Sequence, residues 1–225
     1  RDFCLSRGLG DVYKRQEAIS AFAHAQAADV IVMASHILTS LDAALWGSIT
    51  EAVARTAGVP TLIIRPEGPA FPDVAHATPF TILVPLDGTP FAEAALPGAE
   101  FLARTFQGEI LLLHAVPTLA DVAAQHRKEE EAILYLDSVA TRIERGGIMV
   151  DRLLVTGDPG VSIADVLRTQ RADLIAIATH GQGGFAPGAH SIAEQVLHHS
   201  NTPMLLIHPL IPSDGSDDHQ LLLAQ

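Results

Sequence analysis

The stretch from Arg171 to Pro209, RADLIAIATHGQGGFAPGAHSIAEQVLHHSNTPMLLIHP, decides the fold. It contains an apolar run, a glycine-rich loop over residues 181–188, a segment with a helix-start signal and a second apolar run. Short continuous apolar runs are typical of parallel strands in a sheet that is covered on both faces. We therefore expect strand, loop, helix and strand in this order, and the loop is the first candidate for a ligand site.

The chain uses this pattern twice. Residues 27–66 repeat it: Asp29 aligns with Asp173 at an offset of 144 residues, and Pro60 aligns with Pro203 after a one-residue deletion in the loop. Self-similarity at a fixed offset indicates two related structural units in one chain. We call the earlier unit copy one and the later unit copy two.

The two copies differ in what precedes the repeated part. Copy two has residues 78–160 in front of it, whereas copy one has only residues 1–16, which lack a clean helical or strand period and resemble a translated adapter sequence. We therefore expect copy one to be truncated. The predicted domains are a non-native or disordered segment 1–16, a truncated repeat 17–66, a proline-bearing linker 67–78, a complete domain 79–210 and an acidic tail 211–225.

Hydrophobic periodicity predicts alternating strands and helices in both copies. For copy one, the predicted elements are helices over 17–26 and 47–57 and strands over 28–34 and 60–65. For copy two, they are strands over 81–86, 109–116, 148–155, 173–179 and 203–208, and helices over 90–106, 120–145, 160–170 and 191–200. This alternation predicts a doubly wound, parallel α/β sheet of five strands with helices on both faces.

The composition fits such a globular protein. Hydrophobic residues make up 48% and aromatic residues only 5%, so aliphatic side chains form the expected core. The formal net charge of −12 repels phosphate backbones and anionic lipids, so neither nucleic acid nor a membrane is an expected partner. No apolar run reaches the roughly 18 residues of a membrane span, and no signal peptide is evident; both observations predict a cytoplasmic location.

The sequence offers little basis for catalysis or metal binding. Cys4 is the only cysteine, which excludes a disulfide framework and a thiolate metal site. The histidines lack the spacing of a zinc site, and no motif sets a nucleophile beside a base. We therefore predict no catalytic residue and no metal ligand.

Three loops are expected to meet at the carboxyl edge of the sheet, where open α/β sheets bind ligands. Asp87, which ends the first strand of copy two, could accept hydrogen bonds from a base or ribose or could cap the next helix. Gly157 could allow close approach to a ligand or form a plain strand-to-helix turn. The glycine-rich loop, followed by a capping box from Ser191 to Glu194, could bind phosphate or simply start a helix.

Four motifs, taken together, resemble the universal stress protein family: ILVPLDGTPFAEAALPGAEFLA, LLLHAV, VTGDPGVSIADV and the closing stretch that begins ADLIAIATHGQGG. The resemblance covers 78–210 and, in truncated form, 17–66. It implies a Rossmann-like sheet in the strand order 3-2-1-4-5. It also implies that the last strands of two domains pair, either as an intrachain pseudo-dimer or as a homodimer, here through 60–65 and 203–208.

The resemblance further implies an adenine nucleotide site in copy two, for ATP or AMP with magnesium. ATP-binding members carry G-x2-G-x9-G-[ST], where this chain has Ala178 and Gly181. After a loop one residue shorter, His190 and Ser191 take the last two places, so the phosphate side is altered and weak binding is expected. The implied ligand-contacting residues are Pro85, Asp87, Ala115, Val116, Gly157, Ala178, His180, Gly181, Gly183, Gly184, Ser191 and Ile192.

These observations favour a non-enzymatic stress-response module in which only copy two binds a nucleotide. Copy one carries Ala34 and Ile37 in place of two signature glycines and lacks the strand that bears the acid, so it is expected to bind none. Two alternatives stay open. One is a ligand-free dimerisation scaffold, and the other is a nucleotide hydrolase that would use Asp87, Asp158 or His180.

Overall fold

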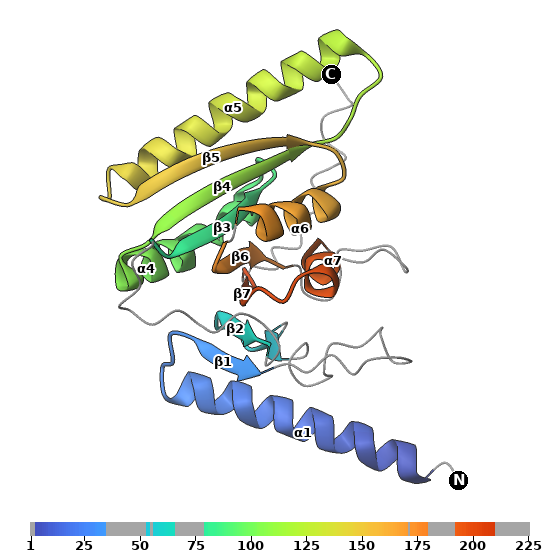
Figure 1. Ribbon diagram of the computed structural model, residues 1–225. Helices are drawn as coiled ribbons and strands as arrows, with labels where there is room; N and C mark the ends of the chain where they lie inside the picture. Colours follow the sequence, from blue (N-terminus) through green and yellow to red (C-terminus); the bar gives the residue numbers. More distant parts are fainter. Residues whose placement is uncertain are drawn as a thin grey trace, which may run out of the picture.

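The computed structural model describes residues 3–34, 53–54, 56–65, 79–170, 172–179 and 192–209. Within them, seven strands form a single sheet (Figure 1). The strands are β1 (Ile31–Ala34), β2 (Thr61–Ile64), β3 (Thr81–Leu86), β4 (Glu109–Val116), β5 (Met149–Thr156), β6 (Leu174–Ala178) and β7 (Met204–Ile207). The helices are α1 (Phe3–Ala25), α3 (Pro90–Glu93), α4 (Leu96–Phe106), α5 (Val122–Glu144), α6 (Pro159–Thr169) and α7 (Ile192–His199).

The strand order confirms the sheet predicted for copy two. The whole sheet runs β1-β2-β7-β6-β3-β4-β5, so the five strands of copy two lie in the order 3-2-1-4-5. Strand β3 pairs in parallel with β4 on one side and β6 on the other, and β5 and β7 extend the sheet outward. The chain therefore winds in both directions from β3, which makes the junction between β3 and β6 the switch point of the sheet.

Copy one joins this sheet through its last strand. Strand β2 pairs antiparallel with β7, with Leu62 opposite Leu205, and β1 pairs in parallel with β2. The predicted intrachain pairing of the last strands is present, and it joins the five strands of copy two and the two described strands of copy one in one sheet. Because β2 and β7 each have a strand on both sides, the predicted alternative, a homodimer through these strands, has no free edge in this arrangement.

Helices cover both faces of the copy-two sheet. Helices α4 and α5 pack on one face, where Val84 of β3 and Leu136 of α5 belong to one buried cluster. Helices α6 and α7 pack on the other, where Leu83 of β3 contributes to a second cluster with Ile163 and Val196. Successive residues of a strand point to opposite faces, so the apolar runs of β3 and β6 serve both cores at once.

The structure differs from the predicted elements at two places. The helix predicted over 90–106 is two helices, α3 and α4, because Pro97 lacks an amide hydrogen and its ring clashes with the carbonyl of Glu93, where α3 ends. Helix α1 runs through most of 1–16, where no regular structure was expected. No proline interrupts it, although Gly8 and Gly10 each weaken a helix by about 1 kcal/mol. The interpretation of 1–16 as a non-native segment stays a prediction.

Candidate functional site

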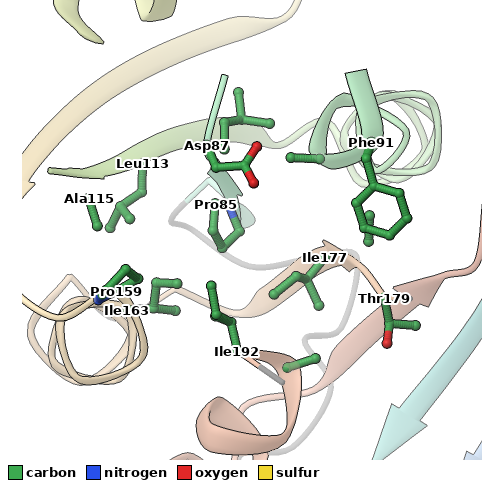
Figure 2. A pocket seen from close by; sticks show the side chains of 14 residues that line it. Pro85, Asp87, Phe91, Leu113, Ala115, Pro159, Ile163, Ile177, Thr179 and Ile192 are labelled. Carbon is green, nitrogen blue, oxygen red and sulfur yellow. The ribbon is translucent and has the colours of Figure 1, made fainter. Parts of the chain in front are cut away.

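A pocket of about 140 Å³ lies at the carboxyl ends of β3 and β6, at the switch point of the sheet (Figure 2). Three helices, α3, α6 and α7, complete its walls with residues from their N-terminal parts. Pockets that enclose a drug-sized ligand usually measure about 300–1,000 Å³, so this one can enclose only part of such a ligand. The lining residues are Pro85, Leu86, Asp87, Phe91, Ala92, Leu113, Ala115, Pro159, Ile163, Ile177, Ala178, Thr179, Ile192 and Ala193.

The walls of this pocket are almost wholly apolar. Asp87 is the one charged side chain that lines it, and Thr179 supplies the one hydroxyl among the described lining residues. An apolar cavity with a few polar groups at fixed positions is the usual form of a small-molecule site, because the walls exclude water and the polar groups orient the ligand. The pocket therefore suits a small, largely apolar group that carries a hydrogen-bond donor toward Asp87.

Asp87 is held in a turn and does not itself cap the following helix. Its Oδ1 accepts hydrogen bonds from the backbone N–H of Thr89 at 2.9 Å and from the Thr89 hydroxyl at 2.6 Å. Thr89 is the N-cap residue of α3, since its Oγ1 accepts a hydrogen bond from the backbone N–H of Ala92 at 3.2 Å. Within the described residues Oδ2 of Asp87 has no such partner, so it can accept a hydrogen bond from a ligand.

Gly88 makes this orientation of Asp87 feasible. Its φ is +87°, a left-handed value that glycine adopts without a steric penalty. The chain can thus leave β3, turn sharply and start α3 while the Asp87 carboxylate stays at the pocket. The DG pair in the sequence is the local signal for this turn.

Gly157 forms the strand-to-helix turn that was one of its two predicted roles. Its φ is +145°, and its backbone N–H donates to the carbonyl of Val116 at 2.9 Å, which ties the ends of β5 and β4 together. Asp158 then caps α6 by accepting from the N–H of Val161 at 3.1 Å, with Pro159 as the first helical residue. Pro159, and not Gly157, lines the pocket.

The pocket brings together a subset of the predicted site residues: Pro85, Asp87, Ala115, Ala178 and Ile192. Val116 is buried, with 2% of its surface exposed, and does not line the pocket. The strand alternation explains this, because Ala115 and Leu113 point to the pocket face and Val116 to the other. Five further predicted residues lie outside the described part of the chain: His180, Gly181, Gly183, Gly184 and Ser191.

Several lining residues were missed in the sequence, although some carried a signal. Leu113 lies two residues before Ala115 on β4, so the period of a strand points to it. Ile163 lies four residues after Pro159 on α6, so the two share one face of that helix. Nothing in the sequence pointed to Phe91, which reaches the pocket from α3 and is seen near its rim in Figure 2.

A polar network lies on the opposite face of β4 and supports the same end of the sheet. The ring of His114 meets that of Tyr135 edge-on at 5.9 Å. The Tyr135 hydroxyl donates to Glu93 at 3.1 Å, and Arg142 forms an ion pair with Glu93 at 2.6 Å. Burial, followed by the nearby Glu93 carboxylate, raises the pKa of Tyr135. Helix α5 is thus fastened to α3, the helix that follows the Asp87 turn.

His114 is partly buried on this face. Burial lowers its pKa, and the negative charge of Asp87 only partly opposes that effect. Its Nδ1 is buried without a hydrogen-bond partner among the described residues. Among the described residues the Asp87 carboxylate is bonded to Thr89 alone, so its second oxygen is available as a hydrogen-bond acceptor.

The described residues contain neither a cluster of metal ligands nor a helix that could span a membrane. No group of three or more His, Cys, Asp or Glu side chains gathers there in a way that could hold a metal ion. None of the described helices has both the length and the apolar character that crossing a bilayer requires.

The chain matches a family model. The model described as the Universal stress protein family aligns with residues 11–65 and 80–208, which include parts of both copies. A universal stress protein of Mycobacterium tuberculosis is 27% identical over 186 residues, which is 80% of this chain and 61% of that protein. One from Synechocystis is 22% identical over 147 residues, which is 56% of this chain and 96% of that protein.

A solved structure shares the fold. A universal stress protein from Archaeoglobus fulgidus superposes with a TM-score of 0.63 at 22% identity, and the match covers 86% of this chain and 66% of that one. The chain thus spans about three fifths of the length of the mycobacterial relative and two thirds of the archaeal one.

Proposed function

Because the chain belongs to the universal stress protein family, we propose that it is a non-enzymatic regulatory module whose copy two binds an adenine nucleotide, ATP or AMP, weakly. The observation that carries this proposal is the apolar pocket at the switch point between β3 and β6, with the Asp87 carboxylate at its edge. Ligands of open α/β sheets bind at this position. A cytoplasmic location is part of the same proposal.

The base is the part of the nucleotide that suits this pocket. Apolar side chains from β3, β4 and β6 would contact its two faces, and Oδ2 of Asp87 would accept a hydrogen bond from the exocyclic amine of adenine. The ribose and phosphates would extend out of the pocket past Ile192 at the start of α7, where the positive end of the helix dipole favours an anion. Magnesium would be held chiefly by the phosphates.

Ala178 supports the expectation that binding is weak. It lies at the end of β6 and lines the pocket, at the place of the first signature glycine of ATP-binding members. Its methyl group therefore occupies space that a glycine would leave to the ligand. One misplaced methyl group in a binding site changes affinity by about 1 kcal/mol or more.

The proposal of a non-catalytic role is supported by the structural contacts of Asp87 and Asp158. One carboxylate oxygen of Asp87 is already engaged by Thr89, and Asp158 caps α6. The hydroxyl that contacts Asp87 is that of Thr89, which is engaged in capping α3, and no described histidine or lysine lies within hydrogen-bond distance of either carboxylate. The hydrolase alternative would therefore depend on His180, which lies outside the described residues.

Calorimetric titration of the chain with ATP, AMP and cyclic AMP, each with and without magnesium, tests the proposal. We expect saturable binding without turnover. Asp87→Asn keeps an oxygen for the turn with Thr89 but loses the charged acceptor, so affinity should fall about tenfold, since a hydrogen bond to a charged group contributes about 1.5–3 kcal/mol. Asp121→Asn, at the N-cap of α5 outside the pocket, is the matched control and should bind normally.

Each outcome of this titration decides between the alternatives. Absence of heat at high micromolar nucleotide would contradict binding and leave the scaffold interpretation, which the antiparallel pairing of β2 with β7 favours. Magnesium-dependent release of phosphate would support the hydrolase. Unchanged affinity in Asp87→Asn would mean that the base binds elsewhere.

A further inference from the structure

Helix α3 is the shortest element that lines the pocket. It has four residues, none of them buried, and Pro97 prevents it from continuing into α4 as one helix. Helices shorter than about 12 residues are only marginally stable on their own. Yet α3 brings Phe91 and Ala92 to the pocket and follows the Asp87 turn directly. Contacts with other elements must therefore hold this part of the pocket wall in place.

The pocket and helix α5 lie on opposite sides of α3. Phe91 lines the pocket near its rim (Figure 2), whereas Glu93 contacts α5 and does not line the pocket. Each residue of a helix advances by about 100° around the helix axis, so these two side chains point about 200° apart. A bond at Glu93 can therefore position Phe91 without touching a ligand.

Both carboxylate oxygens of Glu93 are bonded to α5. Oε1 accepts a hydrogen bond from the Tyr135 hydroxyl at 3.1 Å, and Oε2 forms an ion pair with the Arg142 guanidinium at 2.6 Å. We call these two bonds the Glu93 contact. The Glu93 side chain is only 25% exposed, so salt screens this ion pair less than one between fully exposed groups. A carboxylate held at both oxygens has a fixed orientation, and α3 is fixed with it.

Helix α5 is well packed where it makes this contact. Tyr135 and Arg142 lie about two helical turns apart, so they share the face of α5 that also carries the buried Val139. Tyr135 packs against the buried cluster beneath α5, and its ring meets that of His114 on β4 edge-on at 5.9 Å. The Glu93 contact thus connects α3 to the sheet through a helix that is itself held firmly.

A second ion-pair site joins α5 to the sheet and does not reach the pocket. Arg152 of β5 pairs with Asp137 at 2.8 Å and with Glu144 at 3.1 Å, and β5 supplies no residue to the pocket lining. The ion pair of Arg142 with Glu93, in contrast, joins α5 to an element that lines the pocket. The chain therefore offers two ion-pair sites on one helix, and only one of them is placed to affect the pocket.

We propose that Glu93 is a positioning residue for ligand binding: its contact with α5 fixes α3, and with it Phe91 and the Asp87 turn, in the arrangement that the ligand meets. This inference rests on the proposed function, because the ligand is the same adenine nucleotide. A preformed site binds more tightly than one that must become ordered on binding. Loss of the Glu93 contact therefore weakens nucleotide binding, although Glu93 does not line the pocket.

Amide hydrogen exchange in the ligand-free chain tests the first step. Glu93→Ala should speed exchange at Ala92 and Ala94, whose amides donate the hydrogen bonds of this turn, by about tenfold, because local opening sets the exchange rate. Arg142→Met should have a similar effect, whereas Arg142→Lys keeps the cation and should retain most of the protection. Arg152→Met is the matched control and should leave α3 unchanged.

Calorimetric titration with AMP tests the second step. Glu93→Ala and Arg142→Met should weaken binding about fivefold, because the ligand must then order α3. Arg142→Lys should bind nearly as well as the parent chain, and Arg152→Met should bind equally well. Both Met variants remove an ion pair from α5, so a merely structural role of these pairs would change the two affinities alike. Circular dichroism checks that each variant is folded.

The proposal is overturned if α3 exchanges equally fast in Glu93→Ala and in the parent chain. It is also overturned if the parent chain binds AMP and Glu93→Ala binds it equally well, or if Arg152→Met loses as much affinity as Arg142→Met. A parent chain that binds no AMP contradicts the proposed function instead, and the exchange measurement then decides alone whether Glu93 holds α3.

Discussion

Strands β1 and β6 are the same element of the repeat placed in two different surroundings. Residues 30–34 read VIVMA and residues 174–178 read LIAIA, and each strand pairs in parallel with the strand that ends its own copy. β6 also has β3 on its other side and is almost wholly buried, whereas β1 forms an edge and alternates between intermediate and exposed residues. The apolar pattern therefore specifies the strand, and the neighbours decide its burial.

The candidate site also depends on the presence of β3 beside β6. The pocket lies where β6 meets β3, and its charged residue, Asp87, ends β3. Copy one offers β1 no counterpart of β3 within the described residues, so its end of the sheet has neither the second wall nor the carboxylate. The expectation that copy one binds no nucleotide stays a prediction.

The largest expected contrast concerns one pair of positions that the repeat aligns, Leu174 and Val30. Leu174→Ala should lower the free energy of unfolding by about 2–5 kcal/mol, because it removes a fully buried side chain and leaves a cavity. The matched change, Val30→Ala, should cost less than about 0.5–1 kcal/mol, because this side chain is partly exposed at the edge. Urea denaturation measures both, and equal losses would contradict the comparison.

An intermediate contrast concerns the last residues of the two strands. Ala178→Gly should strengthen adenine nucleotide binding about fivefold, since it removes the methyl group at the pocket wall, worth about 1 kcal/mol. Ala34→Gly makes the identical change at the matched place in β1 and should leave the affinity unchanged. Calorimetry reports both values. If Ala178→Gly binds no better, the methyl group is not what limits affinity.

The smallest expected effect is a pH dependence from β4, a strand without a described counterpart in copy one. Burial lowers the pKa of His114 in the folded chain below its ordinary value of 6.5. Below about pH 6.5 the unfolded chain therefore binds more protons than the folded chain. The free energy of unfolding is unaffected by His114 above that pH and decreases as the pH falls through the folded pKa. His114→Gln should therefore lose less stability than the parent chain between pH 7 and pH 5, by under about 1 kcal/mol since the ring is partly exposed. Thermal unfolding at several pH values measures the difference, and parallel curves would contradict it.

The strands could be predicted from the sequence because they depend on local patterns, whereas their order was implied by the family resemblance. Apolar runs such as ILVPL and LIAIA mark buried parallel strands, and the repeat, through its family resemblance, pointed to the pairing of the last strands, as β2 and β7 confirm. The break between α3 and α4 was also within reach, since Pro97 obstructs a continuous helix. Long elements with strong periods are the most predictable part of a fold.

The site was predictable only in part, because a pocket is made by side chains from distant segments. Asp87 and Ala178 stand next to strand ends, so their place at the carboxyl edge follows from topology. Phe91 and Ile163 reach the pocket only through the positions of α3 and α6, which depend on tertiary packing. The role of Val116 followed the family resemblance, and the alternation of β4 turns that side chain away from the pocket.

The most direct test of the central claim is a titration of the isotope-labelled chain with AMP, followed residue by residue through backbone amide chemical shifts. We predict saturable changes that gather at Asp87, Ala115 and Ala178, the residues that bring the ends of β3, β4 and β6 to one pocket. Ala34, at the matched end of β1, should not shift. No saturable change at millimolar AMP, or changes that gather away from the pocket, would contradict the claim that copy two holds a nucleotide site.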